Sequence, residues 1–198
     1  MLIDIDQNDE LRYIISRHST PACKYLVSKN YDSFNHLEVC PIATIILEHI
    51  AERITRNPGC SLICDYGFDC GEENSRDTFR AFKKNSPWDP LKEPGEADLT
   101  SDVDFCHLKN HLKSKALVFG PTNQASFLNN MGLGVRLSML MEKVNEKQQR
   151  DLMTGVQMLM DDMGNRFKFM ALYSLEAKHL FNEEPPGFFS ICDSPQNV

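Results

Sequence analysis

Residues 41–64, which read PIATIILEHIAERITRNPGCSLIC, decide the class of fold. Proline suits the first position of a helix, and isoleucines then recur at helical spacing. The side chains predicted to line the apolar face of this helix are Ile42, Ile45, Ile46, Ile50 and Ile54. Pro58 and Gly59 end the helix, and the apolar run after them has the length of a buried strand. We therefore predict a helix over residues 41–55 and a strand over residues 60–64.

The flanking sequence extends this pair into an α/β fold. A brief strand over residues 37–40 would complete a βαβ unit, which implies parallel strands and a right-handed crossover. A hairpin is expected over residues 2–16, further strands over 77–82, 115–119 and 167–173, and helices over 102–113 and from residues 123, 135 and 146. The predicted architecture is a mostly parallel sheet with added C-terminal helices. We expect one domain portion over residues 1–175 and a loosely ordered tail over 176–198.

Composition limits the classes of function. The chain has 198 residues, is 41% hydrophobic and carries a formal net charge of -7. This acidic balance argues against a large nucleic-acid interface, which requires a basic face. No apolar run approaches the length of a membrane span, and the acidic N-terminus is neither a secretory signal nor a transit peptide.

The seven cysteines are thinly spread and odd in number, so we expect thiols in a reducing compartment. Cys60, Cys64 and Cys70 lack the spacing of a zinc site. His107 and His111 could share one helix face, but no glutamate between them and no third ligand completes a metal site. No metal is therefore expected. The lone GxG at Gly132 follows a helix rather than a strand, so we interpret it as a break between two helices.

Asp65, Tyr66 and Gly67 follow the predicted central strand, and ligands of open α/β sheets bind at that edge. This tripeptide either lines a pocket, with Tyr66 packed on a ligand, or forms an ordinary turn that leaves the strand. The residues alone leave both interpretations open.

A second group of acidic residues lies around the start of the helix predicted from residue 102. An EF-hand is excluded because the required glycine and distal glutamate are missing. Helix capping explains part of the group, with Ser101 as the N-cap and Asp104 completing a capping box. Glu96 and Asp98 precede the cap and are left without that explanation.

Ordered short motifs make the chain resemble the MidA-type S-adenosylmethionine-dependent protein-arginine methyltransferase family, which includes a mitochondrial complex I assembly factor. The most specific match is residues 94–105, PGEADLTSDVDF. The other matching stretches are residues 36–41 (HLEVCP), 65–67 (DYG), 77–80 (DTFR), 89–90, 120–121, 124, 127–128, 131–132, 136–137, 163–164 and 167–168.

The resemblance implies a class I, Rossmann-like methyltransferase fold and methyl transfer from S-adenosylmethionine to a protein arginine. It further implies mitochondrial location, with a complex I core subunit as the substrate. A guanidinium is always cationic, so carboxylates would hold and orient it. Our candidates for that role are Asp65, Glu96 and Asp98, with Tyr66 and Gly67 as candidate cofactor contacts.

The glycine-rich turn that holds S-adenosylmethionine in such folds has no counterpart here, because no glycine precedes Gly59. We expect the N-terminal, cofactor-binding half of the fold to lie outside this sequence, and the chain alone to be inactive. An alternative is a non-catalytic, shortened paralogue that serves as a binding module in complex I assembly. A weaker third possibility is an unrelated small-molecule enzyme that uses the turn at Asp65.

Overall fold

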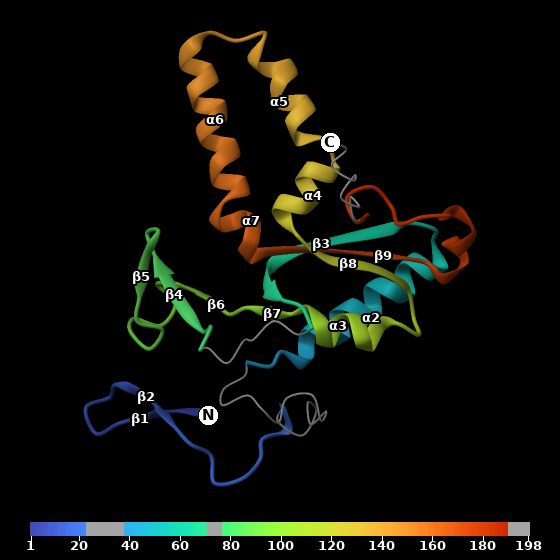
Figure 1. Cartoon of the computed structure of the whole chain (residues 1–198). Coiled ribbons are helices and arrows are strands. Elements are labelled where there is room, and N and C mark those ends of the chain that lie inside the picture. Colours follow the sequence, from blue (N-terminus) through green and yellow to red (C-terminus); the bar gives the residue numbers. More distant parts are fainter. Residues whose placement is uncertain (23–37, 71–76, 190–198) are drawn as a thin grey trace, which may run out of the picture. The chain divides into compact units, whose positions relative to one another are not determined.

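The computed structural model describes residues 1–22, 38–70 and 77–189 (Figure 1). These residues form two compact units. The first contains residues 1–22, 38–43 and 77–102, and the second contains residues 44–70 and 103–189. Each unit is described by itself below.

The first unit begins with the hairpin predicted from the sequence. Strands β1 (Leu2–Ile5) and β2 (Leu11–Ile14) pair antiparallel, with Leu2 opposite Ile14. The carboxylate of Asp6 closes the turn, because its Oδ1 accepts the backbone N–H groups of Asn8 and Glu10.

The same unit holds a three-stranded antiparallel sheet in the order β5-β4-β6. Its strands are β4 (Arg80–Lys83), β5 (Ser86–Trp88) and β6 (Asp98–Thr100). Lys84 and Asn85 both have positive φ, which is the backbone geometry of a tight two-residue hairpin turn. The extra strand expected over 77–82 therefore starts later, at Arg80.

The second unit is built on a mixed four-stranded sheet in the order β7-β3-β9-β8. Its strands are β3 (Cys60–Phe68), β7 (Val103–Asp104), β8 (Leu117–Asn123) and β9 (Phe167–Tyr173). The closing strand β9 has the predicted bounds, but it runs antiparallel to both of its neighbours. Only β3 and β7 pair in parallel. The expectation of a mostly parallel sheet was therefore wrong, because β9 inserts between β3 and β8.

Helix α2 (Pro41–Arg56) confirms the predicted helix, but its orientation differs from the prediction. Its buried residues are Thr44, Leu47, Ala51 and Ile54, whereas Ile42 is 64% exposed and Ile45 and Ile46 are also exposed. Residues 38–40 form no strand, and Leu37 lies outside the described residues, so the predicted βαβ unit is not observed. Of the predicted face, Ile54 is buried as expected. The prediction was wrong for Ile42, Ile45 and Ile46, because Thr44 and Ala51 are small enough to pack closely in their place.

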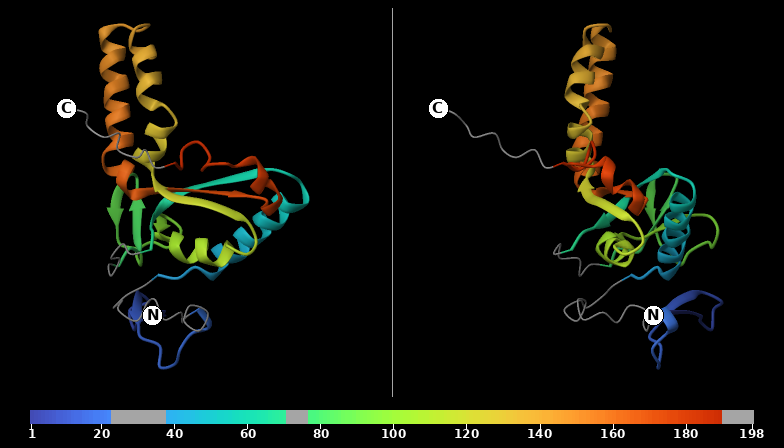
Figure 2. Two further views of the ribbon diagram at one scale, coloured as in Figure 1. Left: turned by 45° about the vertical axis from the view of Figure 1, so that its right-hand side comes forward. Right: turned by 90° about the vertical axis from the view of Figure 1, so that its right-hand side faces the viewer.

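The remaining helices of this unit flank the sheet and extend from it. Helices α2 and α3 (Phe105–Leu112) lie on one side of the sheet, and α4 (Gln124–Asn130) and α7 (Asp162–Arg166) on the other (Figure 1). Helices α5 (Leu133–Met141) and α6 (Glu146–Met160) form a hairpin that projects away from the sheet (Figure 2). The helices expected from residues 123, 135 and 146 are confirmed. No helix in the described part of the chain has the length and apolar character needed to cross a membrane.

An aromatic cluster closes the sheet near the C-terminal end of the described chain. Phe127 stacks on Phe169 with ring centroids 4.3 Å apart, and Phe188 meets Phe127 edge-on at 5.4 Å. Within the range expected to form a tail, the 3-10 helix η2 spans Leu175–Leu180, and Phe188 is 8% exposed. Gly120, at φ +84°, leaves the space that the Phe188 ring occupies.

Candidate functional site

Strand β3 is longer than predicted and contains Asp65, Tyr66 and Gly67 within it. The tripeptide is therefore not a turn leaving the strand, because antiparallel pairing with β9 continues through Asp65 and Tyr66. The carboxylate of Asp65 accepts the N–H of Tyr66 at 2.8 Å and is exposed. Pairing with β9, a strand distant along the chain, was not visible in the sequence.

Polar residues lie opposite one another on three neighbouring strands at the level of Asp65. The partner of Asp65 on β9 is Lys168, and the partner of Lys168 on β8 is Asn123. Residues directly opposite one another share a face of the sheet. Lys168 is buried, and its Nζ donates to Asn123 Oδ1 at 2.6 Å. The pairing therefore places a buried lysine directly opposite Asp65 on the neighbouring strand, and the sequence analysis had not singled out this lysine.

Tyr66 lies on the opposite face of β3 from Asp65. Its ring is 4.0 Å from that of Phe167, and the guanidinium of Arg166 lies 5.0 Å above it. A cation over an aromatic face stabilises the arrangement electrostatically. Tyr66 and Arg166 thus form a stacked pair where α7 joins β9.

Gly67 packs tightly against the start of α3. A Cβ at this position would come within 2.7 Å of the Phe105 ring and closer still to the carbonyl oxygen of Val103. Phe105 is completely buried. The absence of a side chain at Gly67 is therefore needed for the parallel pairing of β3 with β7, and the space it leaves is filled by the protein itself.

Helix α3 starts later than predicted, and its cap differs. Asp104 is the N-cap, and its Oδ1 accepts the N–H of His107 at 2.8 Å. Ser101 is not the N-cap, because Val103 and Asp104 form strand β7 before the helix begins. The predicted capping box was therefore wrong, although an acidic residue does cap the helix.

In the first unit, motif residues distant in sequence converge on Thr78. Its hydroxyl donates to Glu38 Oε2 at 2.8 Å, its N–H donates to Glu38 Oε1 at 3.1 Å, and its hydroxyl accepts the N–H of Asp102 at 3.0 Å. Arg80 donates to Asp102 Oδ1 at 2.7 Å and to the Thr78 carbonyl at 2.8 Å. Thr78 is buried, so this network is shielded from water. Three of the stretches that matched the methyltransferase family thus meet in one hydrogen-bonded network.

Glu96 and Asp98 lie in the same unit, near the β4–β6 pair. Asp98 begins β6 opposite Phe82. Lys83 lies over the Trp88 ring, and its Nζ is 2.5 Å from Glu93 Oε2 and 4.0 Å from Glu96 Oε2. Glu96 remains largely exposed, so its carboxylate is accessible to a cationic partner.

His107 and His111 have separate partners rather than a shared ligand. His107 Nε2 is 3.4 Å from Thr44 Oγ1, and burial lowers the pKa of His107. His111 Nε2 is 2.5 Å from Glu48 Oε1, and Lys115 contacts the same oxygen. Lys115 and His111 together lower the pKa of Glu48 from 4.5 to about 2. These histidines connect α3 to α2.

Two cysteines form a disulfide, between Cys70 and Cys106. Cys40, Cys60 and Cys64 are free and exposed. The expectation of thiols throughout was therefore wrong for Cys70 and Cys106, which lie 36 residues apart in sequence but with Cα atoms only 4.9 Å apart. Among the described residues, one group with possible metal-ligand atoms joins these sulfurs to Asp69, within 4.8 Å of one another. The bond between the sulfurs leaves no thiolate there for a metal.

A groove of about 640 Å³ lies along the α5–α6 hairpin. Its lining is mostly apolar, with Leu140, Leu152 and Val156 among the side chains, and includes the carboxylate of Asp151. None of the candidate site residues lines this groove.

Comparison with known proteins assigns the class. Residues 1–122 match the model of a family described as "Putative S-adenosyl-L-methionine-dependent methyltransferase". Together with the relatives below, this match shows that the chain belongs to this methyltransferase family.

The relatives that match carry a more specific name than the family model. The chain is 41% identical over 177 residues to the mitochondrial protein arginine methyltransferase NDUFAF7 of Homo sapiens, covering 87% of this chain and 39% of the relative. The Bos taurus protein of the same name is 39% identical over 189 residues, covering 93% of this chain and 42% of the relative. The chain thus spans about two fifths of the length of these relatives.

Two solved structures from Burkholderia thailandensis share the fold. An uncharacterised protein superposes with a TM-score of 0.71 at 18% identity, covering 98% of this chain and 52% of its own. A member of the same superfamily bound to S-adenosyl-homocysteine gives 0.67 at 19% identity, covering 86% of this chain and 46% of its own. The chain therefore has an α/β methyltransferase fold with a mixed sheet.

The described residues fit a methyl donor only in part. Close approach of backbone to a nucleoside requires glycines with open space beside them, following a strand. Gly67 lies near the end of strand β3, but Phe105 and Val103 fill the space beside it. Gly132 has open space and φ +83°, but it follows helix α4. The roles of Tyr66 and Gly67 as cofactor contacts stay predictions.

Proposed function

We propose that this chain is part of a protein arginine methyltransferase that uses S-adenosylmethionine and acts in mitochondria on a subunit of complex I during assembly. The observation that carries the proposal is the identity of about 40% to NDUFAF7 proteins over most of the chain. The family match to S-adenosylmethionine-dependent methyltransferases supports the donor. Because the chain spans about two fifths of these relatives, the donor cradle is proposed to lie in the remaining part of the family's fold.

The role proposed for this chain is recognition of the acceptor arginine. A guanidinium presents a planar fork of N–H donors, which carboxylates bind in a bidentate manner. The proposed carboxylates are Glu96 and Asp98 in the first unit and, as a separate candidate, Asp65 in the second unit. Asp65 and Glu96 are exposed enough to accept such a partner. Binding would fix the orientation of the acceptor nitrogen, and misplacement by about 1 Å costs on the order of 10²-fold in rate.

The first test concerns the donor. Titration calorimetry of the 198-residue chain with S-adenosylmethionine is expected to give no saturable heat, because in the described residues no open glycine turn joins a strand to the start of a helix. Saturable binding would overturn the proposed division between donor and acceptor parts.

The second test concerns the reaction. The 5′ end of the transcript is sequenced, and the complete encoded protein is assayed with isotopically labelled S-adenosylmethionine and purified complex I subunits. Mass spectrometry should find labelled methylarginine. Asp65→Asn, Glu96→Gln and Asp98→Asn are each expected to lower the rate on the order of 10²-fold. Glu93→Gln is the matched control, because Glu93 is a neighbouring carboxylate with no proposed role.

A second candidate function is a non-catalytic binding module for complex I assembly. The exposed isoleucines of α2 favour it, because contiguous apolar surface marks interaction sites. A complete transcript that starts at Met1, with a stable product that binds a complex I subunit but methylates nothing, would establish this function instead.

A further inference from the structure

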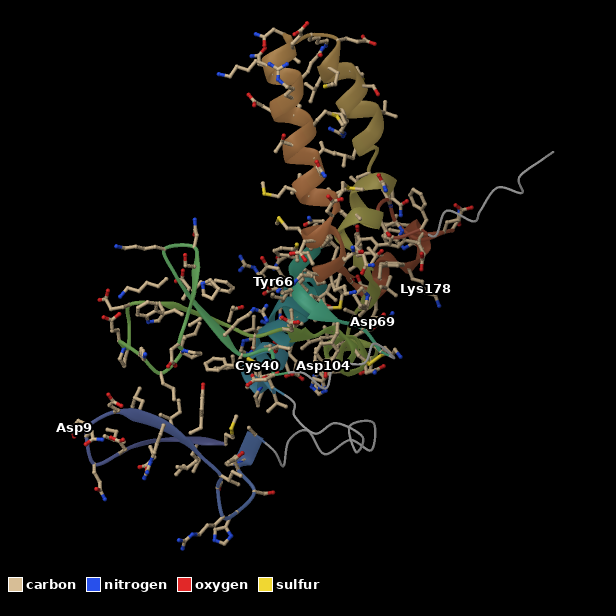
Figure 3. The ribbon with its side chains drawn as sticks, turned by 60° about the vertical axis from the view of Figure 1, so that its left-hand side comes forward. Asp9, Cys40, Tyr66, Asp69, Asp104 and Lys178 are labelled. Atoms are coloured by element: carbon tan, nitrogen blue, oxygen red, sulfur yellow. A yellow bond between two sulfur atoms is a disulfide. The ribbon has the colours of Figure 1, made fainter. Side chains whose placement is uncertain are left out.

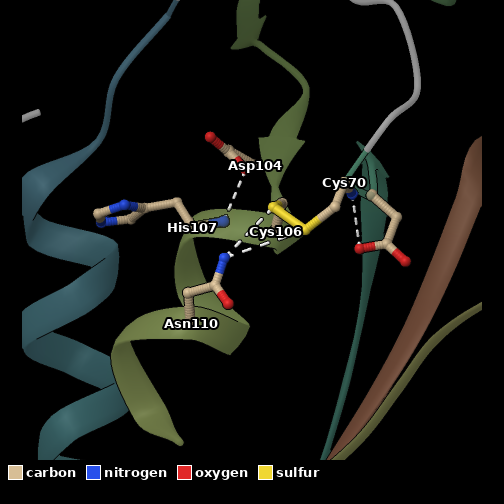
Figure 4. Close-up of a disulfide and its surroundings, with 6 residues drawn as sticks. Cys70, Asp104, Cys106, His107 and Asn110 are labelled. Atoms are coloured by element: carbon tan, nitrogen blue, oxygen red, sulfur yellow. Dashed lines mark hydrogen bonds between the residues drawn. A yellow bond between two sulfur atoms is a disulfide. The ribbon is translucent and has the colours of Figure 1, made fainter. Parts of the chain in front are cut away.

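The disulfide between Cys70 and Cys106 lies at a junction of three elements. Cys70 follows the end of β3, and Cys106 is the second residue of α3 (Figure 4). Strand β7, which leads into α3, pairs with the end of β3 through only two residue pairs, Gly67 with Val103 and Phe68 with Asp104. The disulfide is therefore the covalent tie at a junction held otherwise by a short ladder.

The surroundings of the sulfurs make the bond accessible to small thiols. Cys70 is exposed and Cys106 is partly exposed. Cys106 lies in the first turn of an eight-residue helix, where the backbone N–H groups stabilise a thiolate. The side-chain amide of Asn110 donates to Cys106 Sγ at 3.5 Å. Both features favour Cys106 as the leaving thiolate when an incoming thiolate attacks Cys70.

The nearby carboxylates are occupied by backbone groups. Asp69 Oδ1 accepts the N–H of Cys70 at 2.7 Å, and Asp104 Oδ1 accepts the N–H of His107 at 2.8 Å. Asp69 directly follows β3, Asp104 is the last residue of β7 and the N-cap of α3, and Figure 3 labels both. The negative charges of Asp69 and Asp104 disfavour a nearby thiolate, so they oppose the stabilisation that the helix N-terminus gives to the Cys106 thiolate.

We propose that Cys70 and Cys106 form a reversible redox clamp that ties the end of β3 to the first turn of α3. In the reducing direction, a dithiol transfers two electrons and two protons. The bond between the sulfurs breaks, Cys70 and Cys106 become thiols, and the dithiol becomes a cyclic disulfide. In the oxidising direction, a small-molecule disulfide such as oxidised glutathione accepts the two electrons and is released as two thiols.

The redox state of the clamp controls how often β7 and α3 open locally. With the bond formed, the end of β3 and the start of α3 are held together next to Gly67 and Phe105. After reduction, the two-residue ladder and the packing of Phe105 against Gly67 are the contacts of this junction that remain among the described residues. Opening of this junction should therefore become more frequent in the reduced form, while the rest of the sheet keeps its pairing with β9.

Differential alkylation tests the redox couple directly. The folded 198-residue chain, purified without added thiol or disulfide, is labelled with N-ethylmaleimide and mapped by mass spectrometry before and after treatment with dithiothreitol. Cys70 and Cys106 should be unlabelled before reduction and labelled after it, without denaturant. Cys64, which is free and exposed on the same strand, should be labelled in both states and serves as the internal control.

Hydrogen exchange tests the mechanical consequence. Amides of residues 103–112 should exchange roughly tenfold faster in the reduced protein, and in Cys70→Ser and Cys106→Ser under oxidising conditions. Cys64→Ser should exchange as the unaltered protein does. Labelling of Cys70 and Cys106 under oxidising conditions, or equal exchange of residues 103–112 in both states, would overturn the proposal. Neither measurement depends on methyltransferase activity.

Discussion

The ring of Phe105 fills the space that a side chain on Gly67 would occupy. A Cβ built on Gly67 would lie 2.7 Å from Phe105 Cδ2, which is far inside ordinary van der Waals contact. Phe105 begins α3, and Gly67 lies near the end of β3, so this contact sets how closely the helix approaches the strand. It explains a glycine that, from the sequence, could equally have been a turn residue.

Gly67→Ala should therefore destabilise the protein. Overpacking in a filled core typically costs about 1–3 kcal/mol, and here both a backbone oxygen and a buried ring would have to move. Urea unfolding followed by circular dichroism measures the change. Gly155→Ala is the matched control, since Gly155 lies inside α6 with nothing within 4 Å of its added Cβ. That variant should be stabilised by about 0.4–1 kcal/mol, and equal effects of both changes would contradict the prediction.

Thr78→Val should weaken the network in the first unit. The change keeps the shape of the side chain but removes the hydroxyl that donates to Glu38 and accepts from Asp102. Leaving such buried groups unsatisfied costs about 1–3 kcal/mol, measured as the free energy of unfolding. Thr78→Ser retains the hydroxyl and should lose less. If Val and Ser at this position are equally stable, the hydroxyl contributes nothing.

Acid should remove the stabilisation that Glu48 provides. Lys115 and His111 lower the pKa of Glu48 in the folded protein from 4.5 to about 2. Its contribution is therefore fully present above pH 4.5 and is lost as the pH falls towards 2. The urea midpoint, measured between pH 2 and 6, should fall less steeply in Glu48→Gln than in the unaltered protein. Glu52→Gln, on the exposed side of the same helix, should leave the slope unchanged.

Phe188→Ala should be much more harmful than the same change at its neighbour. Phe188 is 8% exposed and packs against Phe127, whereas Phe189 is 37% exposed. Truncation of a buried phenylalanine costs about 3–5 kcal/mol. Thermal unfolding should therefore show a large loss of Tm for Phe188→Ala and a small one for Phe189→Ala. Similar losses would mean that residues 181–189 do not pack as described.

Local patterns were sufficient where one segment fixes its own structure. The helix at residues 41–56, the hairpin at 2–14 and the strand at 167–173 were all predicted, because proline placement, turn chemistry and apolar runs are local signals. The order of short motifs was enough to indicate the methyltransferase family, which the comparisons confirm. The roles of Asp65, Glu96 and Asp98 stay predictions.

The sequence by itself thus determined the class of fold, the main helices and the family. Only the tertiary structure decided that β9 inserts antiparallel beside β3, that the buried face of α2 holds Thr44 and Ala51 rather than Ile42 and Ile45, and that Cys70 meets Cys106. The physical reason is that pairing, burial and disulfide formation depend on which distant segments approach one another. Periodicity records which residues could be buried, but it does not contain the partner that buries them.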